Sequence, residues 1–191
     1  MAMDGAAAAT RSSTEDALTR VVNLGPGKDF GVVAACTIPS GSILFREAPL
    51  LRLVPDGEGR YDGTYGLGGD RDRCRELLAT LSQHACGKRG EAAGLFERVI
   101  ETNGFVVEDG RATVVFHDIS RLNHSCKSNS RLQWDAEAKE ATVIAKLEIG
   151  AGDEVTLNYG ASGERSERQR HLRERFGFDC SCVLCTPPGE G

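Results

Sequence analysis

Short apolar runs separated by glycine and polar residues dominate the pattern along this chain. Runs of this kind, rich in Val, Ile, Phe and Thr and bounded by turn residues, are typical of β-strands. The pattern predicts strands at residues 30–36, 42–46, 50–54, 105–107, 113–116, 132–134, 142–145 and 154–157.

Helical spacing interrupts this series of strands. Apolar residues recur on one helix face at residues 77–81 and again at 95–100, which predicts two amphipathic helices. Between residues 55 and 70 the chain is dense in Gly and Asp without a periodic apolar face, so we expect a loop. The charged segment 164–175 predicts a surface helix with a narrow apolar stripe. These elements predict an irregular, β-rich α+β domain with a small helical insert at about residues 55–104.

Length and hydrophobic content favour one folded domain. The 191 residues, of which 40% are hydrophobic, are enough for a sizeable core. We expect a disordered tail at residues 1–19, the main domain at 20–160, a separate C-terminal segment at 161–186 and a short tail at 187–191. A domain of this size has no evident need for a second copy, so we expect a monomer.

The charge balance narrows the class of partner. The chain has 23 Lys and Arg against 28 Asp and Glu, which gives a formal net charge of −5. A nucleic-acid binder would present a basic face, whereas a basic protein or peptide fits an acidic chain. The sequence also lacks a signal-peptide pattern and an apolar stretch long enough to span a membrane. We therefore expect no direct binding to nucleic acid or to a membrane.

Three of the seven cysteines crowd into the segment CSCVLC. Cys180, Cys182 and Cys185 have a spacing that presents three thiolates to one ion, and tetrahedral Zn²⁺ needs a fourth ligand. Cys126, within NHSCKSN, is the favoured fourth ligand and His171 is the alternative, because spacing alone does not decide between them. Metal-binding thiols fit a reducing compartment, so we expect the cytoplasm or the nucleus.

The other cysteines, Cys36, Cys74 and Cys86, are scattered along the chain. A free cysteine behaves more often as a small apolar residue than as a ligand. His84 lies near Cys86, but four ligands at suitable spacing are absent there. We interpret these residues as structural or incidental.

Four segments, in order, resemble those of SET-domain protein-lysine methyltransferases. They are GPGKDFGVVAACTIPSG with its continuation FREAPL, then RLNHSCKSN, GDEVTLNYG and FGFDCSCVLC. Their order resembles the SET-and-MYND branch, although the insert has too few Cys and His for a MYND zinc finger. The resemblance implies a SET fold in which the NHSC segment passes beneath a loop formed by GDEVTLNYG, an arrangement that few folds use. It also implies that residues 161–186 are a zinc-bound post-SET tail.

The same resemblance implies a site for S-adenosylmethionine. The backbone at Gly25, Pro26, Gly27 and Lys28 would contact this cofactor, together with the side chains of Asn123 and His124. Phe178 would stack on the adenine ring, and Tyr159 would be the catalytic tyrosine that orients the methyl group and the amine. Taken singly, these residues equally fit an ordinary β-turn, a turn-forming Asn, a structural His and a core Tyr.

Methyl transfer to lysine requires a neutral amine aligned with the methyl group and shielded from water. Lysine has a reference pKa of about 10.4, so an apolar channel and a nearby sulfonium charge are needed to favour the free amine. Two residues depart from the family pattern: Ser128 replaces a usual proline, and Leu157 stands where many members have Phe or Tyr. We expect Ser128 to loosen a turn without abolishing binding, while Leu157 leaves the degree of methylation open.

Two other functions fit the same segments. One is a small-molecule reaction that uses the same cofactor pocket. The other is a non-catalytic SET module that binds a partner peptide. Because both Tyr159 and Asn123 are retained, the sequence favours a protein-lysine methyltransferase with a lysine-containing protein substrate.

Overall fold

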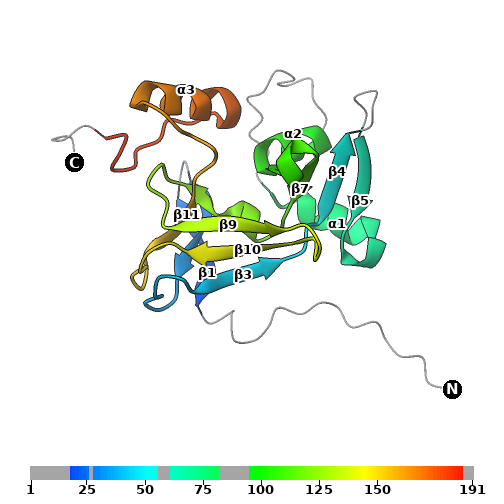
Figure 1. Ribbon diagram of the computed structural model, residues 1–191, viewed down its shortest axis with the longest axis horizontal. Helices are drawn as coiled ribbons and strands as arrows, with labels where there is room; N and C mark the ends of the chain where they lie inside the picture. Colours follow the sequence, from blue (N-terminus) through cyan, green and yellow to red (C-terminus); the bar gives the residue numbers. More distant parts are fainter. Residues whose placement is uncertain (1–17, 26–27, 56–60, 82–94, 187–191) are drawn as a thin grey trace.

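The computed structural model describes residues 18–25, 28–55, 61–81 and 95–186, and Figure 1 shows their arrangement. The predicted tails at 1–19 and 187–191 lie outside these ranges apart from Leu18 and Thr19. Thr19 is already the first residue of a strand. The described chain is mixed α+β and rich in strands, as predicted.

The strands form three small sheets. The first has the order β1-β2-β11-β8, with bounds Thr19–Gly25, Asp29–Ala34, Glu154–Leu157 and Asn123–His124. The second has the order β3-β10-β9, with bounds Ile43–Glu47, Glu140–Ala145 and Ser130–Asp135. The third has the order β5-β4-β7-β6, with bounds Tyr61–Tyr65, Leu51–Pro55, Ala112–Val115 and Phe105–Val107.

One parallel pairing brings distant segments of the chain together. Strand β8 lies parallel to β11, with Asn123 opposite Thr156 and His124 opposite Leu157. On its other side β11 pairs with β2 in antiparallel register. Residues from three of the motif segments therefore meet around β11.

Two separate apolar clusters support the sheets. The main core includes Val32, Phe116, Val143 and Val155, all of them buried. A second cluster lies where the insert helices α1 (Arg71–Leu78) and α2 (Leu95–Asn103) meet the third sheet. Its buried residues are Leu50, Leu51, Leu53, Cys74, Leu78, Leu81, Val99 and Val115. The insert helices thus share a core with the third sheet. The helix predicted at 95–100 is confirmed by α2, whereas the one predicted at 77–81 lies earlier in the chain, because α1 ends at Leu78.

The prediction of a loop across residues 55–70 was wrong in part, because β5 lies inside it and pairs with β4. A glycine explains the missing apolar signal. A Cβ added at Gly63 would lie 3.3 Å from Leu53 Cδ2, so the strand is packed closely against β4 at a position with no side chain. Such a strand has no apolar alternation to read.

Strand β1 was also missed by the sequence analysis. It pairs with β2 at the edge of the first sheet, with a register shift between Asn23 and Gly25. Val21 remains 40% exposed, so the apolar residues of this strand do not alternate cleanly between a buried and a solvent face.

Helix α3 (Arg165–Phe176) confirms the predicted surface helix at 164–175. It begins with a capping box between Glu164 and Glu167 and ends at Gly177, whose φ of 76° is the left-handed conformation usual after a helix. Leu172 is its one buried residue. Figure 1 shows α3 standing apart from the sheets and leading into the C-terminal segment.

None of the helices in the described part of the chain has both the length and the apolar composition needed to cross a lipid bilayer.

Candidate functional site

A groove of about 1900 Å³ lies between the first sheet, the insert and the C-terminal segment. Its walls include Lys28, Asn123, His124, Tyr159 and Phe178, which are predicted site residues from four separate segments. Residues of α2 and β6 also line the groove. The structure therefore gathers these five residues at one place.

Tyr159 follows β11 and is held by one hydrogen bond and by two neighbouring rings. Its hydroxyl donates a hydrogen bond to the carbonyl oxygen of Leu122 at 2.7 Å. Its ring lies 4.9 Å from the ring of Phe176 and 5.3 Å from that of His124. Burial, with a smaller contribution from Glu154, raises the pKa of this phenol above its usual value. The hydroxyl is therefore protonated at neutral pH and is not a general base.

The contacts of His124 define which of its nitrogens carries a proton. The backbone N–H of Tyr159 donates to Nδ1 at 3.1 Å, so Nδ1 is an acceptor and the neutral ring is protonated on Nε2. That Nε2 lies 3.3 Å from Sγ of Cys126. Burial, followed by the charges of His171 and Arg168, lowers the pKa of His124 to about 4. The neutral imidazole thus connects Tyr159 to one cysteine of the cluster.

Asn123 is fixed by Glu154, a residue that the sequence analysis did not single out. Asn123 Nδ2 donates to Glu154 Oε1 at 2.9 Å and to the carbonyl oxygen of Phe30 at 3.3 Å. The other oxygen of Glu154 accepts from Lys28 Nζ at 2.5 Å. Glu154 therefore joins two predicted cofactor residues. The sequence held no local signal for this role, because Glu154 is simply the first residue of β11 within the quoted GDEVTLNYG segment.

The aromatic side chains form a continuous group around the end of the groove. Phe178 lies 6.0 Å from the ring of His124 and 6.5 Å from that of Phe176. Half-buried Phe178 lines the groove, so part of its surface remains available to a planar ligand.

The glycine-rich turn is only partly described. Gly25 has a φ of 89°, and a Cβ built there would meet no atom within 4 Å. Its backbone conformation, not lack of space, therefore favours glycine. Gly25 is not among the described residues that line the groove, and Pro26 and Gly27 lie outside the described residues. The prediction for this turn stays a prediction.

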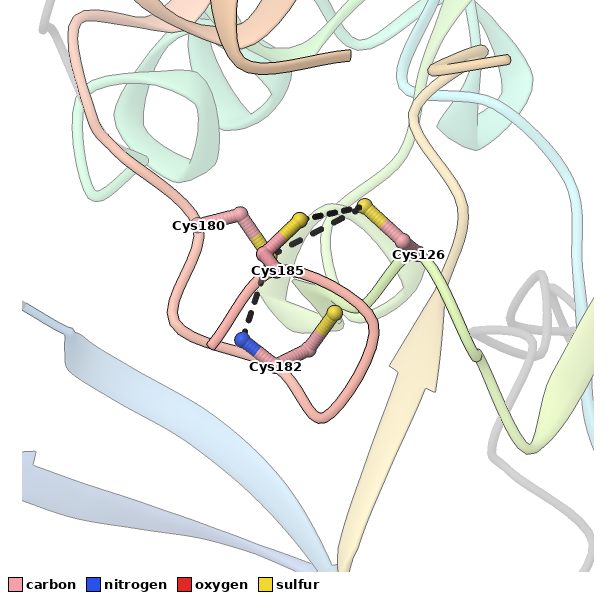
Figure 2. Close-up of side chains that lie close together, drawn as sticks. All are labelled: Cys126, Cys180, Cys182 and Cys185. Carbon is pink, nitrogen blue, oxygen red and sulfur yellow. Dashed lines mark hydrogen bonds between the residues drawn. The ribbon is translucent and has the colours of Figure 1, made fainter. Parts of the chain in front are cut away.

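Four cysteines form a compact cluster beside the groove. Figure 2 shows Cys126 reaching from the segment after β8 toward the loop that carries Cys180, Cys182 and Cys185. The four Sγ atoms all lie within 4.8 Å of one another. His171, the alternative fourth ligand, is not in this cluster, and its Nε2 instead lies 3.1 Å from the carbonyl oxygen of Tyr159.

The geometry of this cluster fits a tetrahedral metal ion. Zn–S bonds of about 2.3 Å place the sulfurs of a tetrahedral site about 3.8 Å apart. Cys126 Sγ lies 3.9 Å from that of Cys180 and 3.5 Å from that of Cys185. Burial and the neighbouring Cys185 thiol raise the pKa of Cys126 to about 12, because a second negative charge would be unfavourable there. A cation at the centre offsets that repulsion, so the donor set suits Zn²⁺.

The other cysteines behave differently from one another. Cys74 is fully buried in the second cluster, as expected of a small apolar residue, and its Sγ lies 3.5 Å from the carbonyl oxygen of Gly66. Cys36 is exposed, which fits an incidental residue and not a small apolar one. Cys86 and His84 lie outside the described residues.

The two departures from the family pattern are both buried. Ser128 is 3% exposed; its Oγ donates to the carbonyl oxygen of Ser130 and accepts from Lys146 Nζ at 2.8 Å. These bonds tie the turn at the position where a proline was expected. Leu157 is 3% exposed in the main core.

Comparison with known proteins agrees with this geometry. The SET domain family model matches residues 29–160. Histone-lysine N-methyltransferase set5 of Schizosaccharomyces pombe is 27% identical over 169 residues, covering 84% of this chain and 48% of that protein. Human protein-lysine N-methyltransferase SMYD4 is 38% identical over 89 residues, covering 43% of this chain and 11% of its own length. N-lysine methyltransferase SMYD2 of Rattus norvegicus is 33% identical over 92 residues, covering 46% of this chain and 21% of that protein.

A solved structure shares the fold. The SET domain of LSMT, crystallised with lysine and AdoHcy, superposes with a TM-score of 0.53 at 12% identity, covering 86% of this chain and 53% of that one. This chain spans about half the length of the set5 relative. The SMYD relatives confirm the predicted resemblance to the SET-and-MYND branch. Since the SET domain model covers well over half of its residues, the chain belongs to the SET-domain family.

Proposed function

We propose that this chain is an S-adenosylmethionine-dependent protein-lysine N-methyltransferase. The observation that carries the proposal is the meeting of Asn123, His124, Tyr159 and Phe178 in one groove of a SET-domain protein. Relatives named as lysine methyltransferases and a similar fold crystallised with lysine and AdoHcy support it.

The residues of the groove suit the proposed cofactor, which supplies a methyl group on a sulfonium centre when bound. Phe178 offers a partly exposed ring for the adenine, and the backbone from Gly25 to Lys28 would contact the remainder. Both hydrogen bonds of Asn123 use its Nδ2 donor. Within the described residues Oδ1 therefore remains an acceptor for the ammonium group of the cofactor.

Tyr159 would position the reacting groups instead of accepting a proton. Its hydroxyl proton is committed to the Leu122 carbonyl, and its oxygen lone pairs remain for the amine and for weak contacts with polarised methyl hydrogens. The substrate lysine reaches its neutral form by desolvation in the groove, as burial disfavours ammonium. No side chain needs to act as a strong base.

We infer that Cys126, Cys180, Cys182 and Cys185 hold one Zn²⁺ and that residues 161–186 form the post-SET tail. The mutual distances of the sulfurs support the metal, and the family model's end at residue 160 supports the boundary. The parallel pairing of β8 with β11 supports the predicted passage of NHSC beneath GDEVTLNYG. Crowded free thiols favour a reducing location, which we propose to be the cytoplasm or the nucleus.

The proposed substrate is a lysine in a protein or basic peptide. The net charge of −5 supports a basic partner, and the set5 relative is named for histone-lysine methylation. The volume of about 1900 Å³ exceeds that of a typical small-molecule pocket, roughly 300–1,000 Å³. This leaves room for a polypeptide segment beside the cofactor, which favours a protein over a small molecule.

Incubation with methyl-labelled cofactor and a cell extract tests the proposal. Protein bands should take up label, and Tyr159→Phe should lower the rate by about 100-fold or more because a group acting at the transition state is lost. Tyr65→Phe, which removes a hydroxyl outside the groove, is the matched control and should retain the rate.

Calorimetry with the cofactor should show binding to both the wild type and Tyr159→Phe. Label recovered in a small compound would show that the substrate is a small molecule and not a protein. Absence of cofactor binding would exclude both cofactor-dependent functions and leave the non-catalytic module that binds a peptide.

A further inference from the structure

Helix α3 is attached to the cysteine loop mainly by polar side chains. Leu172 is its one buried residue, and it packs in a small cluster with Ala161, Cys180 and Cys185. Phe176 at the end of the helix also packs against this cluster, and the rest of the helix sequence, RSERQRHLRERF, is polar or charged. Hydrogen bonds from the helix to the loop add to this apolar contact.

Gln169 hydrogen-bonds to the backbone of Cys180, the first cysteine in the loop. Its Nε2 donates to the carbonyl oxygen of Cys180 at 2.7 Å, and its Oε1 accepts from the N–H of Cys180 at 2.8 Å. Both backbone groups of one residue are thus satisfied by one amide. This pairing fixes the position from which the Cys180 thiol projects.

Arg168 joins the start of the helix to the far end of the same loop. Its Nη1 donates to the carbonyl oxygen of Gly163 at 2.7 Å, and its Nη2 donates to that of Leu184 at 2.8 Å. The same Nη2 lies 3.7 Å from Sγ of Cys185. Among the ion pairs of the described residues none involves Arg168, so the anionic groups that would face its charge are the thiolates of a metal-filled cluster, with Cys185 in contact.

The net charge of a zinc-filled site explains why the Arg168 guanidinium lies beside it. Four thiolates and one Zn²⁺ leave a net charge of about −2 in a partly buried position. A guanidinium that donates to a ligand sulfur spreads this charge and orients the ligand. Gly163 and Leu184 hold the guanidinium in place through its other hydrogen bonds.

We propose that Arg168 and Gln169 are positioning residues for the metal site: Gln169 sets the backbone of Cys180, and Arg168 offsets the thiolate charge through Cys185. The inference rests on the proposed zinc site and adds the part of the chain that assembles it. Neither residue needs to touch the cofactor or the substrate.

Competition with a chromogenic chelator for Zn²⁺ tests this role in the full chain. Wild type should bind one zinc per chain, and Arg168→Met, which keeps the apolar stem and loses the charge, should bind it about 10- to 100-fold more weakly. Gln169→Leu should fall in the same range. Arg168→Lys keeps the charge without the planar fork and should lie between wild type and Arg168→Met. Arg170→Met, at an exposed position on the same helix, is the matched control and should equal wild type.

Cobalt-loaded protein gives a readout independent of affinity and of activity. Loss of the N–H···S contact in Arg168→Met should shift the sulfur-to-metal charge-transfer absorption, whereas Arg170→Met should leave it unchanged. Circular dichroism of each variant checks that the sheets are folded.

The possible outcomes distinguish a failure of the zinc site from a failure of the positioning role of Arg168 and Gln169. A wild type that binds no zinc removes the metal site and, with it, the role of Arg168. A wild type that binds zinc while Arg168→Met, Gln169→Leu and Arg170→Met match it in affinity and spectrum overturns the positioning role alone.

Discussion

Gly31 leaves the space in which Asn123 and Glu154 meet. A Cβ added at this residue would lie 2.8 Å from Asn123 Nδ2 and 3.2 Å from Glu154 Oε1. It would also lie 2.3 Å from Leu24 Cδ1, at the flexible end of that side chain. The lack of a side chain at Gly31 thus fixes where the amide of Asn123 sits in the groove.

Gly31→Ala should therefore weaken cofactor binding by about 10-fold, equivalent to about 1.4 kcal/mol, because Asn123 has to move. Isothermal titration with the cofactor measures the change. In the double variant Gly31→Ala with Leu24→Ala the clash with leucine is relieved, and binding should stay weak. Recovery of full affinity in the double variant would show that Leu24, not Asn123, carries the effect.

Single residues of the site were predictable where their chemistry is distinctive. The CxCxxC spacing identified three members of the sulfur cluster, and NHSC supplied the fourth. Glu154, Arg168 and Gln169 were not predictable, because they act through contacts with residues far away in the sequence. A charged or amide residue in a strand or surface helix gives no local sign of such a partner.

At the scale of elements, one carboxylate links the third sheet to the β9–β10 hairpin. Glu108 follows β6 and accepts from Arg52 of β4 at 2.6 Å and from Lys139, beside β10, at 3.1 Å. The hydrogen bond from Arg52, then that from Lys139, lowers the pKa of Glu108 from 4.5 to about 2. Three elements from separate parts of the chain thus share one anion.

The sign of this pKa shift predicts how stability depends on pH. A carboxyl group with a lowered pKa in the folded state stabilises the fold above its unfolded pKa, and the contribution is lost as the pH falls toward the folded value. The melting temperature of the wild type should therefore fall more steeply between pH 4.5 and about 2 than that of Glu108→Gln. Glu137→Gln, at an exposed position in the neighbouring turn, should follow the wild type. Equal slopes for wild type and Glu108→Gln would contradict this assignment.

Strands with apolar alternation were predictable, and strands without it were not. β10, with the burial pattern of alternating buried and half-buried residues, was found from its sequence. β5 has a glycine on its packed face, and β8 is two polar residues long. Their existence depends on the partner strands β4 and β11, which a local pattern does not contain.

At the scale of the whole molecule, the cysteine loop is supported separately from the sheets. The cluster around Leu172, Cys180 and Cys185 is distinct from the main core that contains Val143 and Val155. Phe178 of the groove lies within the same C-terminal segment. Loss of the metal should thus destabilise the C-terminal segment that lines the groove and leave the sheets folded.

Hydrogen exchange before and after chelation measures this separation. Amides at residues 178–186 should lose at least about 10-fold of their protection, while those of β2 and β10 should keep theirs. Adding Zn²⁺ back should restore the protection. Equal loss in the loop and in the sheets would mean that the metal supports the entire fold.

The groove takes its walls from Lys28 near one end of the described chain and from Phe178 near the other. During synthesis the early strands emerge well before Phe178 leaves the ribosome, so the binding hollow is completed only after the segment around Phe178 has been made. A prematurely terminated product lacking Phe178 and the three cysteines after it would have its sheets but no closed site. The segment that follows α3 thus decides whether a newly made molecule has a closed binding site.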